Sequence, residues 1–351
     1  MKQAFHHPFF IRLRHWEYWN KGVVYAPLYC YWLWLALKAR AVFFLTAANP
    51  GIKNGGFIME RKSEVYQILP HGCYPATCCF LPKTPIEEIL QSIEKAGIGF
   101  PLIAKPDIGE RGLAVKKIED EAALETYAMR IPIPFLVQAY VPYENEVGIF
   151  YYRFPNATKG HISGIVNKEP VAVIGDGVQT VAQLAQANPR YLLQWKQIEV
   201  LQKAHLARVL AQGERLVLVP YGNHSRGSKF TDESLKVTPA LVAGIDDLCQ
   251  KIPGFYYGRL DVRFKDWASL ERGEHFSIIE LNGSGSEPTH IYDPKHSIFF
   301  AWKEVLRHWH ILHRISRANH RNGTPYISLG DCVAEIRRFN KIDAQLSAQV
   351  W

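Results

Sequence analysis

Two segments, Gly258-Arg-Leu-Asp-Val-Arg263 and Ile278-Ile-Glu-Leu-Asn282, decide how this chain of 351 residues folds and what its site can hold. Each shows the apolar and polar alternation of a half-buried β-strand, in which every second side chain lies on the same face. If the two strands are neighbours, Asp261, Glu280 and Asn282 present oxygen atoms at one place. Carboxylate and amide oxygens are ligands that Mg²⁺ prefers. The pair of strands therefore predicts a metal site on a sheet.

The alternative is that these charged residues only face solvent on a half-buried sheet. The sequence after the second strand argues against this, because Asn282 runs directly into Gly283-Ser-Gly-Ser286, which is a costly way to end an ordinary strand. Arg259 shares the face of Asp261 and can reach the same ligand. We therefore interpret the polar face as a binding site.

A lysine followed by a glycine-containing loop lies upstream. The apolar run 100–106 predicts a buried strand that contains Lys105, and the following loop contains Gly109 and Gly112. A lysine can reach phosphate as a point charge, and glycine lets backbone N–H groups approach phosphate oxygens closely. The segment is not a Walker A sequence, which ends in Gly-Lys-Ser/Thr. Alone it is a weak signal for nucleotide binding.

A third element is the end of the predicted strand 135–141, which contains Gln138-Ala-Tyr-Val141. A strand that runs into a hinge can offer backbone N–H and C=O groups to the edge of an adenine ring. Glu146, beyond the hinge, can accept hydrogen bonds from ribose hydroxyls. The alternative for Glu146 is an ordinary surface carboxylate.

The order of these elements resembles the ATP-grasp superfamily. The stretch from Gly258 to His290 is similar to D-alanine–D-alanine ligases, and 171–184 resembles cyanophycin synthetases and bifunctional glutathione synthetases. The stretch 220–229, with its Asn-x-x-Arg-Gly, resembles RimK-like ligases. Together these stretches cover about residues 83–295. The eighteen residues between Asp261 and Glu280 depart from the family pattern, so no close subfamily follows.

The resemblance implies an ATP-grasp fold of the α+β (mixed α/β) class, with two α+β lobes that grip ATP. We expect a basic, aromatic and helical N-terminal region, a segment ahead of the ATP-grasp, a small lobe, and a large lobe with C-terminal helices, over residues 1–62, 63–98, 99–165 and 166–351. Periodicity and capping residues predict helices over 85–98, 120–130, 191–212, 297–316 and 329–347.

The resemblance also implies roles for individual residues. Those implied for ATP binding are Lys83, Lys105, Gly109, Gly112, Gln138, Val141 and Glu146. Those implied for two Mg²⁺ (or Mn²⁺) ions are Asp261, Glu280 and Asn282. Those implied for catalysis are Arg259, Arg226 and Lys105, and those implied for substrate are Asn223, His224, Ser286 and His290. Gln138 stands where the family often has glutamate, and an amide can still pair with adenine.

The implied reaction is an ADP-forming ligation, in which a small-molecule carboxylate is activated as an acyl phosphate and joined to an amine. An amino acid or peptide is the favoured substrate class. One alternative is an ATP-grasp enzyme with another acceptor, either a thiol ligase or a kinase. Another is a non-catalytic nucleotide-binding protein at a membrane, which would be expected to lack the metal ligands.

The net charge of +8 is concentrated at the N-terminus, where residues 1–62 contain nine Lys or Arg against two Glu. The near-neutral remainder argues against nucleic-acid binding. Within this region Val23–Leu37 carries no charge but is shorter than the roughly 20 residues of a membrane-spanning helix. We leave two interpretations open for residues 22–47: a helix that brings residues 1–45 to an anionic membrane surface, or a helix buried in the protein.

The six cysteines show no paired spacing typical of zinc sites, which indicates reduced thiols of a cytoplasmic protein. Such a protein would lie at the inner face of the membrane if its N-terminal region binds lipid. The role of Cys73, Cys78 and Cys79 stays open, as does a homodimer. The three histidines in 308–313 have no evident further ligand, so we expect them to be surface or packing residues.

Overall fold

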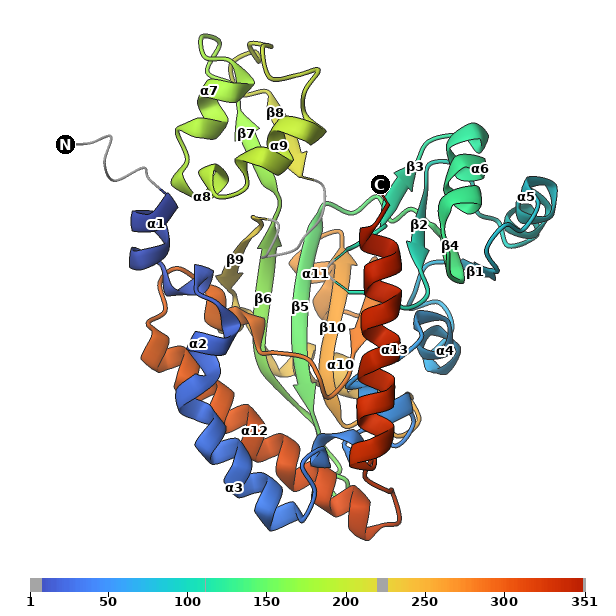
Figure 1. Cartoon of the computed structure of the whole chain (residues 1–351), viewed down its shortest axis with the longest axis vertical. Helices are drawn as coiled ribbons and strands as arrows, with labels where there is room; N and C mark the ends of the chain where they lie inside the picture. The colour runs from blue at the N-terminus through green and yellow to red at the C-terminus, as the bar shows by residue number, and fades with distance from the viewer. Residues whose placement is uncertain (1–7, 111, 220–226, 350–351) are drawn as a thin grey trace.

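The computed structural model describes residues 8–110, 112–219 and 227–349, in which helices surround antiparallel sheets (Figure 1). Every strand pair within these residues is antiparallel, and the sheets contain four, five and two strands. The predicted α+β class is therefore confirmed.

The four-stranded sheet forms a small lobe with the strand order β1-β4-β2-β3. Its elements are β1 (Thr77–Phe80), α5 (Ile86–Lys95), β2 (Leu102–Pro106), β3 (Lys116–Ile118), α6 (Glu121–Arg130) and β4 (Phe135–Ala139). α6 begins where the Asp120 side chain accepts a hydrogen bond from the Ala123 N–H. Ile89 of α5 and Leu124 of α6 pack with Phe135 of the sheet, so this lobe has a core of its own.

The five-stranded sheet is the centre of a large lobe, with the order β11-β10-β5-β6-β9. Its strands are β5 (Asn145–Tyr152), β6 (His161–Glu169), β9 (Lys229–Asp232), β10 (Tyr257–Phe264) and β11 (Phe276–Asn282). α4 (Lys62–Ile68), α10 (Pro239–Gln250) and α11 (Trp267–Glu271) pack on its apolar face. β10 and β11 are neighbours, with Arg259 opposite Asn282 and Asp261 opposite Glu280. The two strands that carry the sequence signal therefore pair as predicted.

The sheets divide the chain differently from the four regions that we expected. β1 and α5 fall within 63–98 but belong to the small lobe, while β5 falls within 99–165 but belongs to the large sheet. The reason is pairing: Thr77 to Phe80 pairs with β4, and all eight residues of β5 pair with β10. The chain therefore leaves the small lobe after Ala139, directly at the predicted hinge.

A small subdomain projects from the large sheet at the top of Figure 1. It consists of β7 (Val171–Ile174), α7 (Val181–Gln186), α8 (Pro189–Leu192), α9 (Trp195–Leu201) and β8 (Arg215–Val219). The predicted long helix over 191–212 is wrong, because α9 ends at Leu201. Beyond it residues 202–207 form turns, and the carbonyls of Leu206 and Arg208 accept hydrogen bonds from the first residues of α7.

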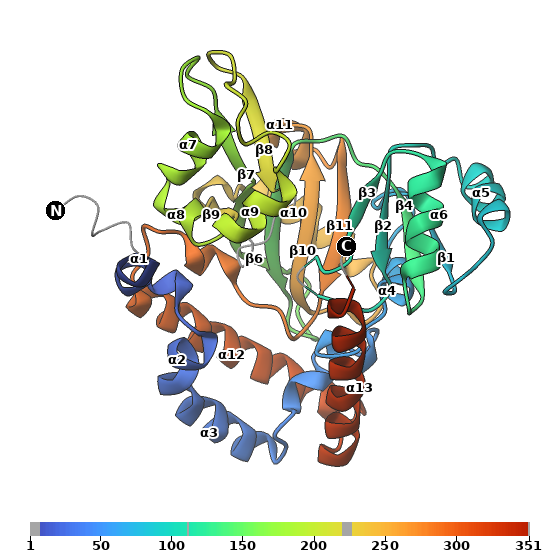
Figure 2. The same ribbon diagram turned by 45° about the horizontal axis from the view of Figure 1, so that its top comes forward.

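The N-terminal region begins beside the projecting subdomain and runs to the opposite end of the molecule, where its third helix packs on the first C-terminal helix (Figures 1 and 2). Its helices are α1 (Pro8–Arg14), α2 (Lys21–Tyr25) and α3 (Tyr29–Ala39), and the C-terminal ones are α12 (Ile298–Arg321) and α13 (Leu329–Ser347). Short 3-10 turns cover 16–18, 26–28, 44–47, 53–56, 234–236 and 289–292. Leu28 and Leu35 are buried in clusters shared with α12, so one face of 22–47 packs within the protein. No described helix has the length and apolar character needed to cross a membrane.

One glycine after β11 is expected to tolerate no side chain. Gly283 follows Asn282 and lies against the Gly55-Gly56 turn, so that a Cβ at Gly283 would lie 2.5 Å from the Gly55 carbonyl oxygen. Replacing Gly283 with alanine should therefore lower the free energy of unfolding by about 1–3 kcal/mol. Gly99→Ala is the matched control, because nothing lies within 4 Å of a Cβ there. Urea denaturation of both variants tests this, and equal stabilities would contradict it.

Candidate functional site

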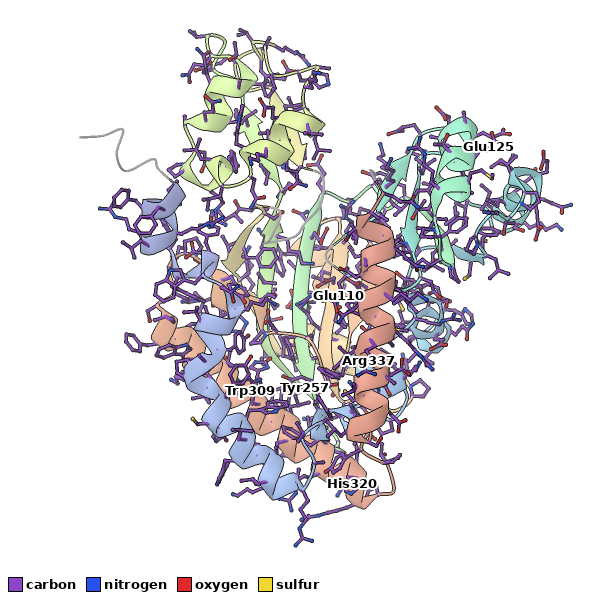
Figure 3. The ribbon with its side chains drawn as sticks, in the orientation of Figure 1. Glu110, Glu125, Tyr257, Trp309, His320 and Arg337 are labelled. Carbon is purple, nitrogen blue, oxygen red and sulfur yellow. The ribbon has the colours of Figure 1, made fainter. Side chains whose placement is uncertain are left out.

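A cavity of about 980 Å³ opens between the small and large lobes. Glu110, at the centre of Figure 3, lines it from the glycine loop. Phe339 of α13 lines it from the C-terminal side, and the same helix continues until Leu346 packs in the core of the small lobe. The cavity is therefore enclosed by both sheets and by a helix that bridges the two lobes.

Most of the predicted site residues line this one cavity. They are Lys105, Gly109, Gly112, Gln138, Val141, Glu146, Arg259, Asp261, Glu280, Asn282 and Ser286. They come from segments up to 181 residues apart in the sequence, so the fold brings together elements that the sequence shows only in order.

Two predicted residues lie elsewhere, and three others cannot be placed. The Lys83 side chain is exposed on the turn after β1 and does not line the cavity. His290 is buried behind β6, where its Nε2 lies 3.6 Å from a carboxylate oxygen of Glu304, so it contributes to packing. The predicted residues Asn223, His224 and Arg226 fall outside the described residues.

Asp261 lies between two cations on the polar face of the sheet. Its carboxylate is 2.8 Å from Arg259 Nε and 2.9 Å from Lys168 Nζ. Burial alone would raise the pKa of Asp261, yet Arg259 and Lys168 hold it below its usual value. The carboxylate is therefore ionised and largely neutralised by its neighbours.

The charges continue across the sheet to Glu146. Lys168 Nζ lies 3.1 Å from one Glu146 oxygen, and Arg263 Nε lies 3.3 Å from the other. Burial alone would lower the pKa of Lys168, but Asp261 and Glu146 raise it above its usual value. Sequence reasoning missed Lys168 and Arg263. β6 also contains His161, Ser163, Asn167 and Glu169, so its sequence does not single out Lys168.

Lys105 lies in the floor of the cavity with polar but uncharged partners. Its Nζ donates hydrogen bonds to the Tyr66 hydroxyl at 2.8 Å and to Gln138 Oε1 at 2.9 Å. Burial, assisted by the nearby Lys62 ammonium, lowers the pKa of Lys105 to about 7. The Gln138 amide also donates to Thr77, so both ends of its side chain are engaged within the protein. Neither end of the Gln138 side chain is therefore free for the adenine contact that the resemblance implies.

The oxygen donors in the cavity are of the chemical type that binds a magnesium ion. Glu280 is half-exposed in the cavity, with one oxygen 3.6 Å from Lys62 Nζ, and Asn282 Nδ2 lies 3.5 Å from an Asp261 oxygen. Two carboxylates and an amide match the hard ligands that Mg²⁺ takes. Within the described ranges, no group of three His, Cys, Asp or Glu side chains forms a further candidate metal site.

Two more carboxylates in the cavity were not predicted. Glu287 lies 2.9 Å from Lys21 Nζ and accepts a hydrogen bond from the Tyr25 hydroxyl, so the N-terminal helices form part of the cavity wall. Glu60 has a carboxylate oxygen with no hydrogen-bond partner among the described residues. Burial, assisted by the nearby Glu280, raises the pKa of Glu60 to about 7, although Lys62 opposes the shift.

The cysteines take no part in this cavity. All six are free thiols, and none lines the cavity wall. Burial raises the pKa of Cys73 to about 11, which disfavours the reactive thiolate.

Comparisons with known proteins point to the groups that the motifs resemble. No protein-family profile matches the chain. It is 24% identical over 261 residues to the glutathione biosynthesis bifunctional protein GshAB of Streptococcus thermophilus. The matched region covers 67% of this chain and 33% of that protein. The chain thus spans about a third of the curated relatives it matches. Bifunctional glutathione synthetases are one of the groups named from the motifs, so that resemblance is confirmed.

Solved structures show a more distant similarity. A bifunctional glutathione synthetase from Pasteurella multocida has a TM-score of 0.36 and 16% identity, covering 66% of this chain and 33% of that one. The D-alanine–D-alanine ligase from Bacillus anthracis has a TM-score of 0.42 and 13% identity, covering 75% and 69%.

Proposed function

We propose that this chain is an ATP-dependent ligase with an ATP-grasp fold, which activates a carboxylate as an acyl phosphate and joins it to an amine. One observation supports this above the others. A lysine, an arginine and three oxygen ligands, which are Lys105, Arg259, Asp261, Glu280 and Asn282, line one cavity between two sheets.

ATP would bind across the hinge between the lobes. Lys105 would contact the phosphates, with the loop containing Gly109 and Gly112 above them. The backbone of residues 139–141 would pair with adenine, and Glu146 would accept from the ribose. Asp261, Glu280 and Asn282 would hold Mg²⁺ or Mn²⁺, which supplies charge neutralisation for phosphoryl transfer.

The reaction proceeds in two steps. A carboxylate oxygen of the substrate attacks the γ-phosphorus, and the bond to ADP breaks. The amine nitrogen then attacks the acyl carbon, phosphate leaves, and the nitrogen loses a proton. Arg259 would stabilise the negative oxygens in both steps. Glu60 would accept the proton, because it lines the cavity and its pKa of about 7 suits a general base at neutral pH.

The amine would bind near the N-terminal helices. Glu287 presents a carboxylate beside Arg259, whose Nη1 donates to the Glu287 carbonyl at 3.3 Å, and Ser286 lines the same wall. A carboxylate attracts an ammonium group, which supports a small amino acid or peptide as a substrate. A cytoplasmic location, contact of residues 1–45 with a membrane, and a homodimer remain predictions from the sequence.

Glu280→Gln should lower ATP turnover by about a hundredfold or more, because it removes a metal-binding charge while conserving shape. The fold should persist, since the side chain is half-exposed and, among the described residues, pairs only with Lys62. Glu274→Gln, which removes an exposed carboxylate on the hairpin after α11, is the matched control.

The assay follows ADP and phosphate release from ATP and Mg²⁺ over mixtures of amino acids, with products identified by mass spectrometry. ADP release that requires both a carboxylate and an amine supports a ligase. ADP release with a phosphorylated product would instead identify a kinase. Equal turnover by wild type and Glu280→Gln would contradict the proposed site.

A further inference from the structure

The outer face of α3 and α12 contains a second hollow, of about 290 Å³, far from the cavity between the lobes. The two helices lie side by side at the lower end of the molecule in Figure 1, and Figure 2 shows the same pairing. Cations line this hollow from both helices: Lys38, Arg314, Arg317 and Arg321. The arginines follow one another at the spacing of a single helix face.

These cations have no acidic partner. No carboxylate lines the hollow, and no ion pair joins any of the four cations to an acidic side chain in the described part of the chain. Lys38 and Arg314 instead lie over aromatic rings, those of Trp34 and Phe154. Four uncompensated positive charges at one place repel each other, and an anion would relieve that repulsion.

A buried histidine forms part of the hollow. His313 is 5% exposed, and its Nε2 has no hydrogen-bond partner among the described residues. It lines the hollow together with Lys38, His310 and Arg317. A buried polar atom without a partner is costly, so an acceptor or donor atom of a ligand would satisfy it.

Apolar side chains continue the same surface along α3. Leu33, Trp34 and Leu37 are exposed, the last by 77%, and their spacing places them on one outward stripe. An exposed apolar stripe beside a cluster of cations matches the two parts of an anionic lipid surface, whose headgroups are negative and whose interior is apolar. A soluble phosphate would satisfy the cations but would leave the stripe in water.

We propose that the α3–α12 face binds the phosphate headgroup of an anionic phospholipid, with Lys38, Arg314, Arg317 and Arg321 around the phosphate. The exposed stripe of α3 then lies in the apolar boundary of the bilayer. The N-terminal helices thus serve both as a wall of the cavity and as a membrane contact. This site is independent of the ligase reaction.

Sedimentation with vesicles tests the proposal. The full chain should pellet with phosphatidylcholine vesicles that contain about one-third phosphatidylglycerol and not with phosphatidylcholine alone. Arg317→Gln with Arg321→Gln should weaken binding by about 25-fold, roughly fivefold for each charge. Arg337→Gln with Arg338→Gln, which removes the same charge from α13, should leave binding unchanged.

The apolar stripe has its own variant. Leu37→Ser should weaken vesicle binding by about tenfold, whereas Leu235→Ser, at another exposed leucine, should not. All of these side chains are exposed or at the edge of the hollow, so unchanged circular dichroism serves as the folding control.

Three results would overturn the proposal. One is failure of the wild type to pellet with anionic vesicles, and another is equal loss in the α12 and α13 charge variants. The third is unchanged vesicle binding by Leu37→Ser, which would leave the apolar stripe outside the bilayer. A wild type that binds millimolar glycerol phosphate but does not pellet with anionic vesicles would assign the hollow to a soluble phosphate.

Discussion

Replacing Asp261 with alanine is expected to lower the free energy of unfolding by about 3–5 kcal/mol, besides abolishing activity. The carboxylate is 2% exposed, with Arg259 and Lys168 within 2.9 Å. Its removal leaves two cations together in a buried place, with one negative charge, that of Glu146, shared between Lys168 and Arg263. Removing one partner of a buried ion pair lowers the free energy of unfolding by far more than the intact pair contributes to it.

Urea denaturation at neutral pH measures this loss. Glu274→Ala breaks an exposed pair with Arg272 and should cost less than about 1 kcal/mol. Adding Lys168→Met to Asp261→Ala should restore part of the stability, because one of the stranded charges is then gone. If Asp261→Ala unfolds at the same urea concentration as the control, then Asp261, Arg259 and Lys168 do not form a buried, mutually stabilising group.

Acidification should act on the same group. The folded-state pKa of Asp261 lies below its usual value, so its stabilising contribution is complete above the unfolded-state pKa near 4. That contribution is lost as the pH falls through the folded-state pKa. The wild type should therefore lose stability in this acidic range more steeply than Asp261→Ala.

The pairing of β10 with β11 could be predicted because the sequence signal lies within the two strands themselves. Both strands alternate in polarity, and a side-chain period of two leaves Asp261 and Glu280 on one face once the strands are adjacent. Lys168 could not be predicted in the same way. Its contact with Asp261 depends on β5 lying between β6 and β10, which is a property of strand order and not of any one segment.

The N-terminal region shows a second limit of prediction from the sequence. Its aromatic and basic composition fits membrane contact and protein packing equally well. In the structure, one face of α3 packs within the protein and the other face is exposed. Leu35 is buried against α12 while Leu37, two residues on, is exposed. The predicted helix over 191–212 failed for a related reason. Its apolar spacing continues past Leu201, where α9 ends, but Leu206 reaches the same core from a turn and Leu210 reaches it from the segment after that turn.

Raising the pH from 7 to 9 is expected to weaken ATP binding by about fiftyfold, because the lysine that would hold the phosphates loses its proton. The pKa of Lys105 in the empty cavity is about 7, lowered by burial, so the free protein holds this lysine half-charged at pH 7 and neutral at pH 9. Phosphate oxygens favour the charged form. Binding must therefore recruit a proton, and each pH unit above 7 costs up to tenfold in affinity.

Calorimetric titration of Mg-ATP at pH 7, 8 and 9 tests this, in buffers of different ionisation enthalpy that report the proton taken up. Lys105→Met should bind weakly at every pH and take up no proton. Stability without nucleotide provides an independent check. A lysine with a lowered folded-state pKa destabilises the fold while it is charged there, so wild-type stability should rise by about 2 kcal/mol from pH 7 to 9.

The two measurements separate the structural claim from the functional one. A rise in wild-type stability that Lys105→Met lacks, together with flat ATP affinity, would mean that Lys105 is buried as described but does not contact the phosphates. Flat stability and flat affinity would mean that water or a counter-ion reaches its Nζ. A rise in stability with falling affinity is what the proposed site requires, because one proton on Lys105 then links the free cavity to the bound nucleotide.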